Sequence, residues 1–363
     1  MESSTITPTI FNLPALVENL PAADRERFER IYHVASAVGY LKAPASMRPW
    51  IERNFGSVEA VEKQQVIKVT NRIILEGALF NPIRSLRPVQ RDAGANLAAE
   101  IEASRGDPFC DPEAGTPQDT FGRIRGRLSI SASNVAKSDA LHSLIIFNEH
   151  DPLKLSEPAV IDYFNVALKW AREAHNIDRS APYFFMLWNC LWPAGASVIH
   201  GHAQMTLTRG MHYPKIEHWR RSALLYRIGH GVNYFDDLRA VHAALGLSRQ
   251  VGAAQVLVNL APIKEKEMLV IGERPDADFC RAVYLALETL VSRLGTRSFS
   301  LGLYWRPIDG VEEDWTGFPT IVRVVDRGDP QQRTADFGAM EVYAASVIAA
   351  DPFAVAEALR NAG

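Results

Sequence analysis

The chain repeats one order of strand-like and helix-like segments, and this repetition limits its possible folds more than any other feature. Each half reads as two apolar runs of strand length, a long segment with helical periodicity and two further strand-like runs. In the first half we expect strands at 127–131, 144–147, 183–188 and 198–208 and a helix at 157–175. In the second half we expect strands at 255–259, 268–271, 298–305 and 320–325 and a helix at 276–294. The sequence therefore predicts an α+β fold with antiparallel sheets and flanking helices, in which one unit is duplicated.

The remaining segments define the expected domain organisation. A chain of 363 residues is long enough for two domains or for one duplicated fold with an extension. Residues 1–77 are expected to form a helical N-terminal extension, divided into short helices at Pro44 and Pro49, with a role in packing or oligomerisation. Residues 78–230 and 231–363 then form the two halves of the duplicated fold. The first of these begins with a loop-rich stretch, and the second closes with a helix near its end.

Composition and charge exclude several classes of protein. The 39 basic and 42 acidic residues leave a net charge of -3, too small for an overall field that would hold a nucleic acid or an anionic membrane. No stretch reaches the length of a membrane span and the first residues carry no basic leader, so we expect a cytoplasmic protein without a membrane partner. Cys110, Cys190 and Cys280 are odd in number and far apart, which argues against a disulfide framework and leaves one of them available to a metal.

Two histidines and a glutamine alternate with apolar residues in the last strand expected in the first half. Side chains alternate between the faces of a strand, so His200, His202 and Gln204 are expected to project to one side. The other face carries the apolar side chains Ala203, Met205 and Leu207 and is the better candidate for the core. The polar face is therefore expected to form the wall of a pocket.

These residues suit a reaction at phosphorus. An imidazole has a reference pKa of about 6.5, so a large neutral fraction is available at physiological pH as a nucleophile that can later leave again. Ser197 and Gln204 can donate hydrogen bonds to phosphate oxygens as charge develops on them. Gly195 allows the backbone to approach a ligand closely.

The spacing of this run resembles a known active-site signature. Asn189, Gly195, Ser197, His200, His202 and Gln204 match that of the galactose-1-phosphate uridylyltransferase family, within the histidine-triad superfamily. The resemblance extends from about residue 79 to the C-terminus. It implies a duplicated α+β fold, a homodimer with sites near the subunit interface, and a covalent nucleotidyl intermediate on His202. It also implies that Ser197 and Gln204 hold the phosphates and that Asn189 and Gly195 line the substrate site.

The resemblance assigns further roles outside the signature. Arg84 and Arg87 lie in a segment similar to the basic loop of the family and would contact substrate phosphates. Asn134 lies where the family has an asparagine near the nucleotide. Surface arginines on a solvated loop are the alternative interpretation of the first pair.

A structural zinc site is also implied by the resemblance. Its ligands would be Asp107, Cys110, His150 and His200, with aspartate in place of one thiolate of the family. In the alternative interpretation Cys110 is a small buried hydrophobe and His150 begins a helix. A second metal site, known in some members, needs histidines that are missing from 272–275 and 299–307, so we expect that site to be absent.

Two departures from the signature affect the predicted substrate more than the chemistry. Leu191 stands where a glycine is usual, and Gly201 replaces the proline between the histidines. The leading hypothesis is a nucleotidyltransferase of the hexose-1-phosphate uridylyltransferase type, acting on a nucleotide sugar or sugar 1-phosphate and a phosphate-bearing acceptor, with no metal in the chemical step. One alternative is a phosphorylase or hydrolase of dinucleoside polyphosphates or nucleotide sugars. Another is a nucleotide-binding regulatory protein without catalysis.

Overall fold

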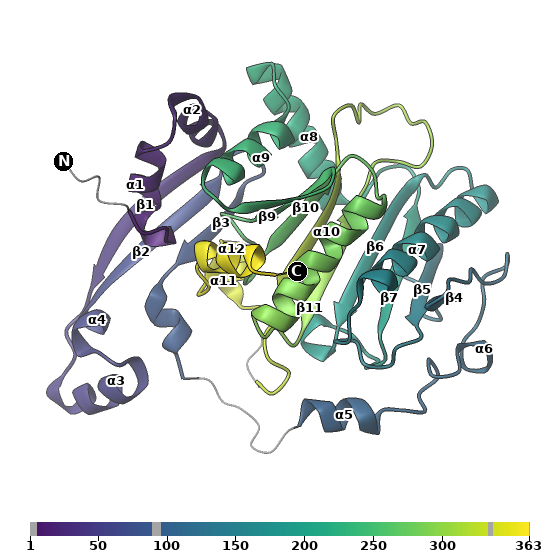
Figure 1. Cartoon of the computed structure of the whole chain (residues 1–363), viewed down its shortest axis with the longest axis horizontal. Helices are drawn as coiled ribbons and strands as arrows, with labels where there is room; N and C mark the ends of the chain where they lie inside the picture. The colour runs from purple at the N-terminus through teal and green to yellow at the C-terminus, as the bar shows by residue number, and fades with distance from the viewer. Residues whose placement is uncertain (1–5, 89–95, 333–336, 363) are drawn as a thin grey trace.

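A nine-stranded sheet forms the centre of the molecule in the computed structural model, which describes residues 6–88, 96–332 and 337–362 (Figure 1). Its strand order is β4-β5-β7-β6-β11-β12-β10-β9-β8, and every neighbouring pair is antiparallel. The strands are β4 (Ser129–Ser133), β5 (Leu141–Phe147), β6 (Tyr183–Cys190), β7 (His202–Thr208), β8 (Ser248–Val251), β9 (Ala254–Val258), β10 (Met268–Gly272), β11 (Phe299–Tyr304) and β12 (Thr320–Asp326).

The predicted duplication is present in the topology. The first half runs β4-β5-α7-β6-β7 along the chain and the second runs β9-β10-α10-β11-β12, where α7 is Glu157–Ile177 and α10 is Ala277–Glu288. The order β4-β5-β7-β6 in the sheet is matched by β9-β10-β12-β11, and the two units meet where β6 pairs with β11. The α+β fold with antiparallel pairing is thus confirmed.

Helices α7 and α10 cover one face of the large sheet (Figure 1). Helix α7 begins at a cap in which Ser156 Oγ accepts a hydrogen bond from the Ala159 amide. Its buried stripe includes Val160, Phe164, Ala167, Ala171 and Ala174, which repeat at helical spacing. On the neighbouring strand β6, Trp188 is buried on the helix side, whereas Phe185, Leu187 and Asn189 on the alternate positions are partly exposed. The first half therefore keeps its second sheet face free of these two helices.

A smaller four-stranded sheet lies beside the large one, in the order β1-β2-β3-β13. It consists of β1 (Tyr32–Tyr40), β2 (Lys63–Asn71), β3 (Glu76–Phe80) and β13 (Ser346–Ile348), the last being parallel to β3. Its strands come from both ends of the chain, and β3 crosses the predicted boundary at residue 77. The division into three units stays a prediction.

The N-terminal segment contains the expected helices but also two strands that sequence reasoning missed. The helices are α1 (Leu13–Glu18), α2 (Ala22–Ile31), α3 (Arg48–Phe55) and α4 (Val58–Glu62). Phe28 and Ile31 are buried at helical spacing in α2, and the same periodicity suggested that the helix continued through Tyr32. The chain instead becomes extended at Tyr32 because it pairs with Asn71, a distant partner that local periodicity does not reveal.

The other helices connect or cover these sheets. They are α5 (Leu97–Ala103), α6 (Pro112–Gly115), α8 (Pro214–His230), α9 (Tyr234–Ala244), α11 (Ala339–Tyr343) and α12 (Pro352–Arg360), with short 3-10 turns at η3 (Pro82–Leu86) and η4 (Trp192–Ala194). Among the described helices, none is both long enough and apolar enough to cross a lipid bilayer.

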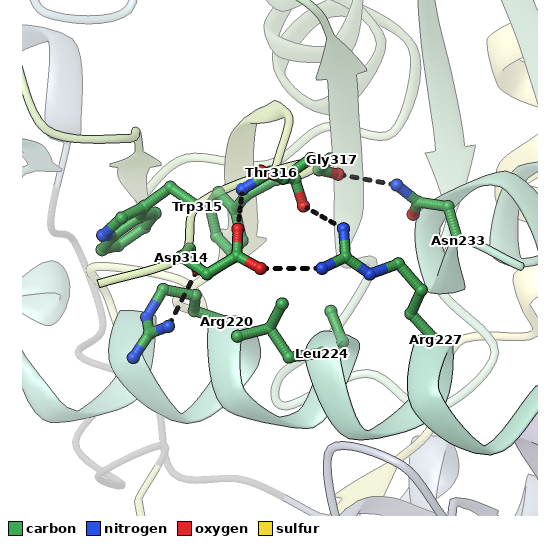
Figure 2. A pocket seen from close by; sticks show the side chains of 10 residues that line it. Arg220, Leu224, Arg227, Asn233, Asp314, Trp315, Thr316 and Gly317 are labelled. Atoms are coloured by element: carbon green, nitrogen blue, oxygen red, sulfur yellow. Dashed lines mark hydrogen bonds and ion pairs between the residues drawn. The ribbon is translucent and has the colours of Figure 1, made fainter. Parts of the chain in front are cut away.

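The loop between β11 and β12 is fastened to α8 and α9, as Figure 2 shows. Arg227 forms an ion pair with Asp314 at 2.7 Å, Arg220 donates to the Asp314 carbonyl at 2.9 Å, and Asn233 donates to the Gly317 carbonyl at 2.8 Å. The space among these side chains has a volume of only about 10 Å³. It is a structural junction and leaves no room for a substrate.

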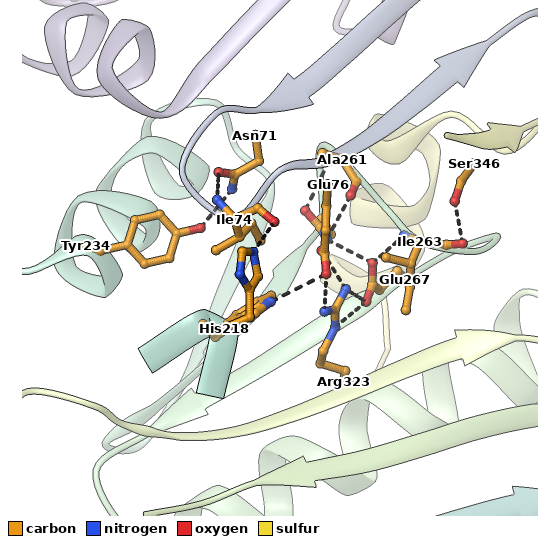
Figure 3. A network of polar contacts seen from close by, with 12 residues as sticks. Asn71, Ile74, Glu76, His218, Tyr234, Ala261, Ile263, Glu267, Arg323 and Ser346 are labelled. Carbon is orange, nitrogen blue, oxygen red and sulfur yellow. Dashed lines mark hydrogen bonds and ion pairs between the residues drawn. The ribbon is translucent and has the colours of Figure 1, made fainter. Parts of the chain in front are cut away.

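A buried ionic cluster joins the two sheets (Figure 3). Arg323 of β12 is 5% exposed and lies 2.7 Å from a carboxylate oxygen of Glu76 in β3 and 2.6 Å from one of Glu267. The guanidinium also lies over the Trp219 ring, 4.7 Å from its centroid. Burial raises the pKa of Glu267, because it disfavours the charged carboxylate. The positive charge of Arg323 offsets this cost for both buried carboxylates.

We expect Arg323→Met to destabilise the fold by about 3–5 kcal/mol, because it leaves the carboxylates of Glu76 and Glu267 buried without a cation. Urea unfolding followed by tryptophan fluorescence measures the change. Arg125→Met is the matched control, because Arg125 pairs with Glu113 in full contact with solvent and should lose no measurable stability. Equal stability of the two variants would contradict this account of the sheet junction.

Candidate active site

His202 is the first residue of β7 and lies on the sheet face that the helices leave uncovered. Its ring is 6% exposed, and its Nδ1 is 2.8 Å from the His200 carbonyl oxygen. Because a carbonyl oxygen can only accept, Nδ1 carries the proton and Nε2 keeps its lone pair. Burial lowers the pKa of His202, which keeps the ring neutral. Among the described residues no group hydrogen-bonds to Nε2, so this atom is available as a nucleophile.

His200 does not share the strand with His202, which corrects one sequence expectation. The strand expected from residue 198 begins only at His202. His200 precedes it, and its ring lies between the Phe147 carbonyl and the Asp107 carboxylate. The apolar face was predicted correctly, since Ala203, Met205 and Leu207 are at most 1% exposed. The alternation holds only where β7 is paired, and the residues before it follow a turn.

Gly201 between the two histidines has a local structural reason. A Cβ atom at this position would lie 2.7 Å from the Phe147 ring, so no side chain fits without movement. The Gly201 amide also donates to the His150 carbonyl at 3.1 Å, a bond that proline could not form. The departure from the family signature is therefore matched by the packing of Phe147.

Gln204 is held by His142, a residue that sequence reasoning missed. The Ser138 amide donates to His142 Nδ1 at 2.9 Å, so His142 Nε2 carries the proton. That Nε2 donates to Gln204 Oε1 at 2.9 Å, which directs the amide nitrogen of Gln204 away from His142. His142 belongs to β5, which begins at Leu141 and not at the expected position 144. Alternation along the longer strand would have placed His142 on the face of the predicted pocket.

Asn134 lies next to the same histidine. Its Oδ1 accepts from the Ala136 amide at 3.0 Å, and its Nδ2 is 3.0 Å from His142 Nε2. Since both of these nitrogen atoms carry hydrogen, their contact does not satisfy the Asn134 amide. Asn134 and Gln204 therefore both lie against His142 Nε2, and their amide nitrogens have no acceptor among the described residues.

Asn189 lies at the junction of the two halves. In the antiparallel register it faces Ser300 of β11, whose hydroxyl donates to Asn189 Oδ1 at 3.1 Å. Arg327 donates to the same Ser300 hydroxyl at 3.0 Å, which brings a cation from the second half toward the site. Gly195 has a φ of 93°, and a Cβ there would be 3.9 Å from Asn189 Nδ2. Sequence reasoning selected Asn189 and Gly195 but not Ser300 or Arg327, whose positions follow from strand pairing alone.

Leu191, where the resembled signature has a glycine, adopts a backbone conformation that favours glycine. Its φ of 65° and ψ of 173° belong to a region that side chains disfavour, yet its own side chain is 1% exposed. The Leu191 carbonyl accepts from the amides of Ala194 and Ala196, which closes the turn before Ser197. Strain at a loop beside the histidines is thus offset by burial of leucine and by these hydrogen bonds.

Three predicted residues are not joined to this cluster by any hydrogen bond within the described parts of the chain. Ser197 is exposed on the loop that leads to His200. Arg84 on η3 and Arg87 directly after it are exposed, and neither forms an ion pair with a described residue. Their roles stay predictions.

Asp107, Cys110, His150 and His200 come together as predicted, with one possible ligand atom of each within 4.8 Å of the others. The Nδ1 atoms of His150 and His200 are 3.1 Å apart, and Cys110 Sγ is 3.4 Å from the first and 3.6 Å from the second. Asp107 Oδ1 lies 3.6 Å from His200 Nδ1. Cys110 is exposed, so the alternative in which it is a small buried hydrophobe is wrong.

The hydrogen bonds of the two histidines leave a lone pair of each ring in this cluster. His200 Nε2 donates to the Phe147 carbonyl at 2.8 Å and His150 Nε2 to the Ile101 carbonyl at 2.9 Å, so both Nδ1 atoms carry lone pairs. Asp107 Oδ2 is buried and has no hydrogen-bond partner among the described residues. Two lone pairs, a sulfur and a carboxylate in such proximity fit a bound cation.

In sequence comparisons no family model and no curated protein matches the chain. Comparison of structures is more informative. An ADP-glucose phosphorylase from Arabidopsis thaliana, solved with bound ADP-glucose, has a TM-score of 0.62 at 13% identity and covers 81% of this chain and 98% of that chain. A GalT-like protein from the same plant has a TM-score of 0.58 at 15% identity over 71% of this chain and 93% of that chain. A uridylyltransferase has a TM-score of 0.56 at 14% identity over 76% and 93%. The chain shares the fold of these proteins.

The hydrogen-bond directions predict the state of two histidines. In 15N-detected spectra at neutral pH, His202 should carry its proton on Nδ1 and His142 on Nε2.

Burial lowers the pKa of His142, so protonating this ring costs folding free energy. The stability that the neutral ring contributes should therefore be lost as pH falls below about 6.5. His142→Gln should remove that part of the pH dependence. Ser138→Pro lacks the amide that donates to His142 Nδ1, so the proton of His142 should no longer be confined to Nε2. An unchanged tautomer in this variant would contradict the assignment.

Proposed function

We propose that this chain is a nucleotidyltransferase in which His202 forms a covalent nucleotidyl intermediate, in the manner of galactose-1-phosphate uridylyltransferases. The observation that carries the proposal is the buried, neutral His202 ring, with Nδ1 bonded to the His200 carbonyl and Nε2 without a hydrogen-bond partner among the described residues. The fold shared with an ADP-glucose phosphorylase and a uridylyltransferase supports it.

The chemistry follows from the state of the imidazole. The Nε2 lone pair attacks the phosphorus next to the nucleoside, an N–P bond forms, and the P–O bond to the sugar phosphate or other phosphate breaks with its electron pair on the leaving oxygen. The ring then carries positive charge, which the His200 carbonyl stabilises through the Nδ1 proton. An acceptor oxygen attacks the same phosphorus, the N–P bond breaks, and the neutral imidazole returns.

Donors around His202 would stabilise the charge that develops on the phosphate. The Gln204 amide nitrogen is directed toward the ligand because His142 occupies its oxygen, and Asn134 adds a second amide. Ser197 would supply a hydroxyl from the preceding loop, and Asn189 and Gly195 would line the same space. We assign Arg84 and Arg87 to substrate phosphates, where a guanidinium can bind two oxygens at once.

The substrates would be a nucleotide sugar or sugar 1-phosphate together with a phosphate-bearing acceptor. A phosphorylase or hydrolase of nucleotide sugars or dinucleoside polyphosphates would use the same intermediate with inorganic phosphate or water as acceptor. The ADP-glucose phosphorylase fold match keeps this second reaction open beside the first. A homodimer is part of the proposal, and a cytoplasmic location stays a prediction of the sequence.

The intermediate can be tested directly. The full chain is incubated with ADP-glucose, UDP-glucose or diadenosine tetraphosphate, quenched, and its intact mass measured. We expect the mass of a nucleotidyl group on the native chain and none on His202→Asn. His33→Asn, on an exposed strand of the small sheet, should label as the native chain does.

The acceptor is identified by what removes the label. Release by a hexose 1-phosphate indicates the transferase, release by inorganic phosphate the phosphorylase, and release by water the hydrolase. Nucleotide binding without label, unchanged in His202→Asn, would overturn the proposal in favour of a regulatory protein.

We also propose that the cluster of Asp107, Cys110, His150 and His200 holds a structural zinc ion. Tetrahedral zinc with bonds of about 2.0–2.3 Å keeps its nitrogen and sulfur ligands about 3.3–3.6 Å apart. The separations among the two Nδ1 atoms and Cys110 Sγ and from Asp107 to His200 are 3.1–3.6 Å, and all four groups lie within 4.8 Å of one another. Bound there, zinc would anchor the loop that carries Asp107 and Cys110 and fix His200. The backbone carbonyl of His200 in turn orients His202.

Metal content should depend on the aspartate of this cluster. We expect about one zinc per native chain by elemental mass spectrometry, and clearly weaker retention in Asp107→Asn during dialysis against a chelator. Asp107→Cys should retain zinc at least as well as the native chain, because thiolate is a stronger ligand. Asp111→Asn changes a nearby carboxylate that caps α6 and should keep full metal content. Native chain without zinc after purification in zinc-containing buffer would contradict the site.

A further inference from the structure

Strand β1 forms a free edge of the small sheet. It is the terminal strand in the order β1-β2-β3-β13, so on its outer side no described strand pairs with it. Every residue from Ala35 to Tyr40 is exposed. The strand contains no proline and no lysine, arginine or carboxylate, which are the residues that usually protect an edge from pairing with another chain.

The sequence of β1 is nearly the same in both directions from Ser36. The residues on either side of it are alanines, the next but one are valines, and both ends of the strand are tyrosines: Ala35 and Ala37, Val34 and Val38, Tyr32 and Tyr40. Only His33 and Gly39 break the symmetry. A two-fold axis through Ser36 would therefore pair like with like along an antiparallel ladder.

We propose that β1 pairs antiparallel with β1 of a second copy of this chain about a two-fold axis at Ser36, making one continuous sheet across the dimer. The free amide and carbonyl groups of each edge would satisfy the other, and the interface would be isologous. His33 would face Gly39 of the second copy, so the axis brings no like charges together. This inference rests on the homodimer of the proposed function and adds its interface, but it does not rest on the reaction at His202.

The same pairing explains the exposed apolar side chains near the C-terminal end of β1. Val38 is 44% and Tyr40 73% exposed, whereas Tyr32 at the base of the strand is 3% exposed beneath α2. In the proposed register Tyr40 lies opposite Tyr32 of the second copy, and Val38 opposite Val34. The exposed C-terminal end of each β1 strand therefore lies opposite the buried N-terminal end of the other. Leu41, Met47 and Trp50, 45–47% exposed around the start of α3, would also lie at that contact.

Sedimentation of the full chain tests the association. We expect a species of twice 40.3 kDa at micromolar concentration and a shift to a single chain in Ser36→Lys, which places a charge on the axis next to its own copy. Leu75→Lys adds the same charge at an exposed turn of the same sheet, away from the β1 edge, and should remain dimeric. Circular dichroism and the melting temperature of Ser36→Lys should match those of the control, which excludes misfolding.

Cross-linking tests the register. Directly opposed residues in an antiparallel pair have Cβ atoms about 4.5–5.5 Å apart, so Ser36→Cys should form an intermolecular disulfide on mild oxidation. Val38→Cys faces Val34 of the second copy and should not, and the native chain with its exposed Cys110 gives the background. A native chain that sediments as a monomer overturns the proposal. So does a dimer that is unaffected by Ser36→Lys and is not linked by Ser36→Cys, which would place the interface elsewhere.

Discussion

The pairing of β6 with β11 is the constraint on which both the fold and the candidate site depend. It is the one place where the two similar halves become a single sheet, and its register sets Asn189 opposite Ser300. Strand β6 also pairs with β7 as far as Gln204, two residues after His202 begins that strand. A site on the first half thus rests on residues of the second, and Arg327 approaches it only through that junction.

The chemistry of the site is set by backbone groups whose hydrogen-bonding role cannot change. Carbonyl oxygens fix the proton positions on His150, His200 and His202, and a backbone amide fixes the proton of His142. From these positions follow the free Nε2 of His202, the direction of the Gln204 amide and the lone pairs of the metal cluster. Such groups need not reorganise during a reaction, which is the physical meaning of a preorganised site.

Sequence reasoning was most reliable where the signal was local. The repeated strands of both halves and the helices α7 and α10 were placed within a few residues, since apolar periodicity reports directly on burial against one sheet face. Helices α8 and α9 and strand β8 were not predicted. Sequence reasoning failed for β1 and β2, whose extended conformation depends on the pairing of Tyr32 with Asn71, and for His142, because the start of β5 was placed too late. The signature residues were recognised, but Ser300 and Arg327 carry no motif and are brought to Asn189 only by strand pairing.

By itself the sequence determined the repeated order of elements, the two faces of β7 and the candidate residues of the site, because spacing along a strand or helix is enough to place a side chain on a face. Only the tertiary structure decided which nitrogen of each histidine is free, how Asp107 and Cys110 reach His150 and His200, and how strands from both ends of the chain form one small sheet. The reason is separation along the sequence: Arg323 and Glu76 are 247 residues apart, yet they are hydrogen-bonded within a buried cluster. No local pattern encodes such a contact, which arises only when the chain has closed around it.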